Sequence, residues 1–161
     1  MTPQQERDYL QQSLDEAVRS VAAGGGPFAA LIVHQGRIIA RASNGVTRLN
    51  DPSAHAEVEA IRRAAAHLKH PHLADCTLYS SCMPCPMCLA TALWAHIPRI
   101  VFAASAEQAA HAGFDDSALA HRLYGQASPV NLPPDLLVQY PLQHANAPFE
   151  AWLAKADRQP Y

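Results

Sequence analysis

Two short motifs contain the side chains of this 161-residue chain that could hold a metal ion and move protons. The first is His55-Ala56-Glu57, and the second is Pro84-Cys85-Pro86-Met87-Cys88. Zinc in proteins prefers nitrogen and sulfur ligands, and a catalytic zinc keeps one position for water beside three protein ligands. His55, Cys85 and Cys88 provide such a set. The spacing therefore predicts a catalytic zinc ion held by these three side chains.

Glu57 stands two residues after His55. Its carboxylate is the wrong type of group for a fourth soft ligand of zinc. Beside a metal, a carboxylate can take a proton from water and pass it to the reacting molecule. The order H-x-E followed by P-C-x-x-C resembles the signature of the zinc deaminases that act on nucleobases. We therefore expect Zn²⁺ as the cofactor and Glu57 as a catalytic proton carrier.

A structural zinc site is the main alternative at these motifs. Structural sites are normally closed by four protein ligands. Cys82 could supply the fourth, because Cys82, Cys85 and Cys88 are each three residues apart. In that case the chain would be a zinc-stabilised module without catalytic activity.

Composition predicts one domain, residues 1–161, with a sizeable core. Hydrophobic residues make up 49% of the chain, charged residues only 16%, and the net charge is −2. No basic patch is visible, so we expect a small-molecule substrate and no nucleic-acid partner.

The cysteines and the N-terminus predict the compartment. Cys76, Cys82, Cys85 and Cys88 lie close together, which is typical of metal binding in a reducing compartment rather than of secreted disulfides. The polar N-terminus lacks an apolar signal core, and no apolar run approaches the roughly 18 residues that span a bilayer. We expect a cytoplasmic protein without a membrane partner.

Helical and strand patterns alternate along the chain and predict one α/β sheet covered by helices on both faces. A helix capped by Thr2 is expected to end at Gly24-Gly25-Gly26-Pro27. Predicted strands cover residues 28–33, 37–43, 76–80, 99–104 and 136–140. Predicted helices begin near residues 53 and 85, a terminal helix covers 148–156, residues 44–52 form a polar loop, and 113–116 a polar helical stretch.

Both motifs therefore fall at helix beginnings. Residues two apart on a helix point about 200° apart, so His55 and Glu57 cannot face one point by direction alone. At a helix start, however, a long glutamate side chain can bend past the helix end toward the metal. A thiolate such as Cys85 is favoured there by the helix dipole and by free backbone N–H groups.

The likeness to a known family extends over nearly the whole chain. It rests on residues 25–30, 50–58, 80–82, 84–88 and 112–116 (Ala-Gly-Phe-Asp-Asp), and on the terminal Tyr161. With these segments the chain resembles the cytidine-deaminase superfamily, and within it the bacterial guanine deaminases. The resemblance implies a three-layer α-β-α sandwich with a five-stranded mixed sheet. It also implies a homodimer in which the C-terminal segment is exchanged, so that the last tyrosine helps form the partner's pocket.

The activity that the resemblance implies is hydrolysis of guanine to xanthine and ammonia, with Glu57 carrying protons from water to the ring and the leaving amine. It further implies that Asn44 hydrogen-bonds the base and that Asp116 assists proton transfer to the amine. A solvated turn is the alternative for Asp116. Ala56 is expected beside the substrate.

Three aromatic residues are predicted around the substrate. Phe28 and Trp94 are expected as apolar or stacking walls, with plain core packing as the alternative for each. Tyr161 is expected to cover the base and exclude water.

Met83 departs from the family pattern, which has a glutamate directly before the proline of P-C-x-x-C. We expect this change to affect the identity of the substrate rather than zinc binding. Cytosine, a nucleoside or an adenosine in tRNA are the alternatives to guanine.

Overall fold

The computed structural model describes residues 1–129 and 131–161. Its centre is a five-stranded sheet with the strand order β2-β1-β3-β4-β5. The strands are β1 (Ala29–His34), β2 (Arg37–Ser43), β3 (Cys76–Cys82), β4 (Arg99–Ala104) and β5 (Leu137–Gln139). Strand β1 pairs antiparallel with β2 and β3, whereas β3, β4 and β5 run parallel. The predicted five-stranded mixed sheet is confirmed.

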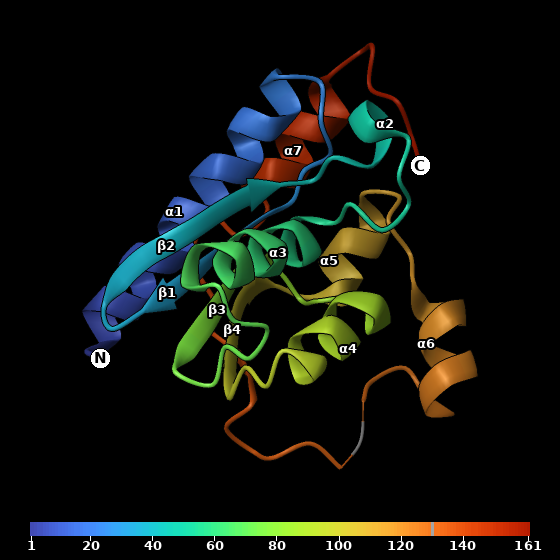
Figure 1. Ribbon diagram of the computed structural model, residues 1–161. Helices are drawn as coiled ribbons and strands as arrows, with labels where there is room; N and C mark the ends of the chain where they lie inside the picture. The colour runs from blue at the N-terminus through green and yellow to red at the C-terminus, as the bar shows by residue number, and fades with distance from the viewer. Residues whose placement is uncertain (130) are drawn as a thin grey trace.

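Helices cover both faces of this sheet (Figure 1). The α1 and α7 helices pack together on one side, and α3 and α4 pack together on the other. The helices are α1 (Pro3–Ala22), α2 (Val46–Leu49), α3 (Ala56–Leu68), α4 (Pro86–Trp94), α5 (Ala106–His111), α6 (Ser117–Tyr124) and α7 (Ala147–Ala154). The expected three-layer sandwich is thus present.

Strand β1 shows why the chain folds in layers. Successive side chains of a strand point to opposite faces of the sheet. Ala30 and Ile32 belong to the core cluster formed with α3 and α4, whereas Leu31 and Val33 belong to the cluster formed with α1 and α7. All four are buried, so β1 is apolar on both faces, as a central strand must be.

The first helix begins as the sequence predicts. Thr2 Oγ1 accepts a hydrogen bond from the Gln5 backbone N–H, and Gln5 Oε1 accepts one from the Thr2 N–H. This reciprocal pair satisfies two donors that a helix start leaves free.

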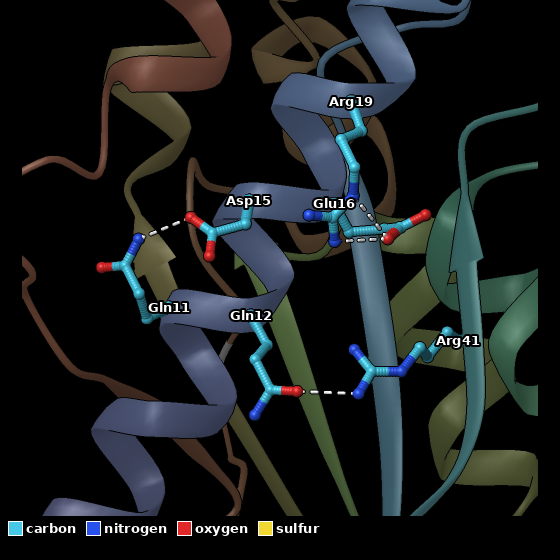
Figure 2. A network of polar contacts seen from close by, with 6 residues as sticks. All are labelled: Gln11, Gln12, Asp15, Glu16, Arg19 and Arg41. Atoms are coloured by element: carbon cyan, nitrogen blue, oxygen red, sulfur yellow. Dashed lines mark hydrogen bonds and ion pairs between the residues drawn. The ribbon is translucent and has the colours of Figure 1, made fainter.

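Figure 2 shows polar contacts on the solvent side of α1. Gln11 Nε2 donates to Asp15 Oδ1 at 2.9 Å, and Arg41 Nη2 on β2 donates to Gln12 Oε1 at 2.7 Å. Because these groups are exposed, they add little to stability. The core cluster that contains Leu10 and Leu14, rather than this surface network, fixes α1 against the sheet.

Three local predictions were wrong. The loop predicted over 44–52 contains the short helix α2, and β3 continues to Cys82 rather than ending at residue 80. The predicted helical stretch 113–116 is the loop between α5 and α6, because Gly113 adopts a φ of 97°, which no helix contains. Within residues 1–129 and 131–161, no helix has both the length and the apolar character needed to cross a membrane.

Candidate active site

The three predicted zinc ligands converge at the beginnings of α3 and α4. His55 is the N-cap residue of α3, Cys85 is the N-cap residue of α4, and Cys88 lies in the first turn of α4. His55 Nδ1 lies 3.6 Å from Cys85 Sγ and 3.5 Å from Cys88 Sγ, and the two sulfurs are 3.5 Å apart. Together these atoms form one side of a compact coordination site.

These separations fit a tetrahedral zinc ion. With Zn–S bonds of about 2.3 Å and Zn–N bonds of about 2.0–2.1 Å, tetrahedral coordination places a nitrogen and a sulfur roughly 3.5–3.6 Å apart, and two sulfurs roughly 3.8 Å apart. One histidine and two cysteines are also the donor types that zinc prefers. The geometry and chemistry of the site therefore suit Zn²⁺.

The thiols of the two cysteines have different pKa values. The hydrogen bond between the two cysteine sulfurs, together with the neighbouring His55, lowers the pKa of Cys85 to about 4. The same hydrogen bond and burial raise the pKa of Cys88. Cys85 is therefore a thiolate at neutral pH, the form that binds a metal.

Glu57 lies against this ligand set and is only 5% exposed. Its Oε1 accepts a hydrogen bond from Ser80 Oγ of β3 at 2.8 Å, and its Oε2 accepts one from Cys88 Sγ at 3.3 Å. Burial raises the pKa of the Glu57 carboxyl, and the negative charge of Cys85 raises it further. Glu57 and His55 line the same cavity, although side chains two residues apart on a helix point in different directions. A buried carboxyl with a raised pKa beside a metal site is suited to receive and release a proton.

A cavity of about 450 Å³ opens in front of the ligand set, and its volume lies in the range of small-molecule sites. Asn44 contributes a polar group to its wall and is only 2% exposed. Asn44 Oδ1 accepts a hydrogen bond from the Val46 backbone N–H at 3.1 Å. This bond fixes the amide so that its NH₂ group is the part left to donate to a bound molecule.

The two acidic residues that precede α6 have different surroundings. Asp115 Oδ1 accepts a hydrogen bond from the Ser117 N–H at 2.9 Å, which lowers the pKa of Asp115 and makes it part of a local turn. Asp116 is half-buried at the cavity, where burial and the charge of Cys85 raise its pKa. Both aspartates line the cavity, and the carboxyl of Asp116 is the one without this turn hydrogen bond.

Aromatic rings form the apolar side of the cavity. Phe28 makes edge contacts with Phe114 and Phe149, with ring centroids 4.9 and 5.7 Å apart. Phe114 in turn contacts Tyr161, with centroids 5.3 Å apart, and both line the cavity. Phe114 was not predicted from the sequence as a cavity residue, although its place directly before the two aspartates was a usable signal.

Two predicted substrate residues lie elsewhere. Trp94 is 84% exposed at the end of α4 and does not line the cavity, because that helix buries the side of Cys88, Leu89 and Ala92. The prediction of Trp94 as a pocket wall is wrong for this chain. The Ala56 side chain is fully buried in the core, so only its backbone N–H, free at the first position of α3, can face a ligand.

Cys82, the alternative fourth ligand, is turned away from the metal site. It is buried, and its Sγ donates to the Ser105 carbonyl oxygen at 3.6 Å. Burial raises the pKa of its thiol, which opposes the thiolate form. Among the described residues, the cluster of metal-binding atoms consists of His55, Cys85 and Cys88 without Cys82. The site therefore has the three-ligand form typical of catalytic zinc.

Comparison with known proteins agrees with this geometry. Residues 3–104 match the family described as the cytidine and deoxycytidylate deaminase zinc-binding region. Guanine deaminase of Bacillus subtilis (strain 168) is 44% identical over 154 residues, which cover 95% of this chain and 97% of that protein. A tRNA-specific adenosine deaminase of Aquifex aeolicus is 34% identical over 139 residues, or 82% of this chain and 91% of that protein.

Solved structures show the same relationship. The X-ray structure of Bacillus subtilis guanine deaminase superimposes with a TM-score of 0.72 at 39% identity, covering 100% of this chain and 99% of that chain. The protein NE0047, solved in complex with 2,6-diaminopurine, gives a TM-score of 0.76 at 25% identity, covering 94% and 84% of the two chains. With its sheet, its ligand triad and its sequence in agreement, the chain belongs to the cytidine and deoxycytidylate deaminase family of zinc-dependent enzymes.

Proposed function

We propose that this protein hydrolyses guanine to xanthine and ammonia. The observation that carries the proposal is the convergence of the zinc ligands, Glu57 and Asn44 on one cavity. This arrangement occurs in a chain 44% identical to a guanine deaminase over 95% of its length.

The reaction replaces the amino group on C2 of guanine by oxygen from water. When bound, zinc lowers the pKa of water toward about 7 and so supplies the nucleophile. Glu57 takes one proton from water and passes it to the ring nitrogen, then takes the second proton from the hydroxyl now bound to C2 and passes it to the amine. The C2–N bond breaks, and the amine leaves as ammonia. The raised pKa of Glu57 favours this shuttle, because a carboxyl whose pKa is raised holds an accepted proton more readily before passing it on.

The remaining site residues hold the base and assist its conversion. The Asn44 NH₂ group donates to an acceptor on the purine, and the backbone N–H of Ala56 supplies a second donor. Phe28 and Phe114 pack against the apolar faces of the ring. Asp116 assists proton transfer to the amine, which its half-buried position at the cavity and its raised pKa support.

Tyr161 covers the base in this proposal. It lines the cavity, and burial raises the pKa of its phenol, with the Glu57 charge as a further cause. Its hydroxyl therefore stays protonated and available as a donor. In the structure this Tyr161 belongs to the same chain as the cavity. A homodimer with exchanged C-terminal segments, in which the partner's Tyr161 takes this place, and a location in the cytoplasm are part of the same proposal. The clustered cysteines support the reducing compartment.

Deamination of an adenosine in tRNA is the second candidate, favoured by the 34% identity to the Aquifex aeolicus enzyme. A protein that binds RNA normally presents a basic face. Here 12 lysines and arginines stand against 14 acidic residues, which favours a free base as the substrate.

Product analysis tests the proposal. Zinc-loaded protein incubated with guanine should yield xanthine and ammonia in equal amounts, measured by chromatography and an ammonia assay. The same protein with Glu57 replaced by glutamine serves as the control for background hydrolysis. Zinc-loaded wild-type protein that leaves guanine unchanged would overturn the assignment.

A further inference from the structure

Tyr161, the last residue of the chain, lies directly over Gly26. A side chain added at Gly26 would overlap the Tyr161 hydroxyl oxygen and lie 2.8 Å from Cζ and 3.0 Å from Cε1. Real Cβ atoms essentially never approach other atoms this closely, so a side chain at residue 26 requires the Tyr161 ring to move from this position.

The backbone at Gly26 does not itself require glycine. In the run of three glycines, only Gly24 has a positive φ, at 88°. Gly26 is buried, and its carbonyl oxygen accepts a hydrogen bond from Ser20 Oγ of α1 at 2.8 Å. The backbone conformation of Gly26 is therefore open to alanine, and the obstacle to a side chain there is the Tyr161 ring.

The rest of the tail supports the same placement of the ring. Arg158 Nη1 donates to the carbonyl oxygens of Lys155 and Leu153 at 3.0 and 3.3 Å, which holds the start of the tail against the end of α7. The Tyr161 ring then contacts Phe114 and Trp152, with centroids 5.3 and 6.4 Å apart. Gly26 forms the surface beneath the hydroxyl end of that ring.

We propose that Gly26 is a positioning residue for the reaction: the space at its Cα seats the Tyr161 phenol at the cavity and so sets how the C-terminal tail covers the substrate. The proposal rests on the proposed role of Tyr161 in guanine deamination. Gly26 acts through Tyr161 and does not itself touch the substrate.

The test is a double-mutant cycle between Gly26→Ala and deletion of Tyr161. Each single change should lower kcat/KM for guanine by on the order of 10–100-fold, the range caused by small misplacements at an active site. The double variant should be no slower than the deletion alone, because the added methyl group has no tyrosine left to displace. Zinc content should stay at one ion per chain throughout.

Tryptophan fluorescence reports the tail position without any substrate. The chain has two tryptophans, so Trp94→Phe leaves Trp152, next to Tyr161, as the only one. In this background Gly26→Ala should shift the tryptophan emission, as deletion of Tyr161 should. Gly26→Ala should also make the C-terminus more accessible to carboxypeptidase. Ser20→Ala is the matched control, because it removes the hydrogen bond to Gly26 without adding an atom under the tyrosine. It should leave the emission close to that of the parent.

Several outcomes decide the matter. An unchanged emission and an unchanged carboxypeptidase rate in Gly26→Ala overturn the proposal, as does a further loss of activity when Gly26→Ala is added to the deletion. If Gly26→Ala fails to fold while the double variant folds, the overlap with Tyr161 is established; misfolding of both overturns it. If no form acts on guanine, the proposed function fails. The fluorescence result still decides whether Gly26 positions the Tyr161 ring.

Discussion

At the scale of single residues, the proposed mechanism depends on the protons that Glu57 carries. Glu57→Gln keeps the shape of the side chain and the bond from Ser80 Oγ, but an amide cannot accept the proton of water. We predict normal zinc content with kcat lowered about 10²–10⁴-fold, the usual contribution of a proton carrier. Metal analysis and steady-state kinetics on the same preparation check this. Near-wild-type turnover would remove Glu57 from the mechanism.

The cysteines provide a matched pair of variants. Cys85→Ala removes a thiolate ligand at the start of α4, so the purified protein should contain little zinc. Cys82→Ala removes a buried thiol that contacts the Ser105 carbonyl, so it should retain one zinc ion per chain. Metal content by elemental analysis distinguishes the two. Full zinc in Cys85→Ala, or loss of zinc in Cys82→Ala, would contradict the three-ligand assignment.

The residue types of the site were largely accessible from sequence, but their surroundings were not. His55, Cys85 and Cys88 follow from spacing alone, since zinc has few possible donor types. Trp94 was placed wrongly and Phe114 was given no role, because an aromatic residue on a helix or in a loop packs inward or outward according to tertiary contacts. The bond that orients Asn44 depends on α2, a helix too short to leave a pattern.

At the scale of secondary structure, two helices begin with the same reciprocal cap but at different distances from the cavity. Thr2 caps α1, and Ser105 caps α5, whose Ala106 and Ala109 line the cavity. We predict that Thr2→Ala and Ser105→Ala each lower the free energy of unfolding by about 1 kcal/mol. Only Ser105→Ala should also raise KM for guanine. Urea unfolding and kinetics measure both effects, and a KM change in Thr2→Ala would contradict this division.

Long elements were predictable where their burial is periodic. The apolar spacing of α1 and the continuous apolar run of β1 both reflect faces buried in the core. The short elements α2 and α5, with four and six residues, carry too few positions for a period to emerge. The extension of β3 to Cys82 comes from its pairing with Ala104 of β4, a tertiary contact that local sequence does not contain.

At the scale of the whole molecule, zinc joins elements that are far apart in sequence. Its ligands come from the beginnings of α3 and α4, on either side of β3. A ligand that binds only the folded state stabilises it by mass action. We predict that removal of zinc by a chelator lowers Tm and that added Zn²⁺ restores it. In Cys85→Ala the chelator should have no effect on Tm, and an equal shift in that variant would place the stabilising metal elsewhere.

The choice of substrate is also a property of the whole molecule, because the cavity combines residues from near both ends of the chain. The most direct test is kcat/KM of the zinc-loaded protein for guanine, adenine, cytosine, cytidine and a tRNA anticodon stem-loop containing adenosine, followed by ammonia release. Guanine should have the highest value, with one xanthine formed per ammonia. A higher value for any other substrate, or stoichiometric zinc without ammonia release from guanine, would contradict guanine deamination as the function of this protein.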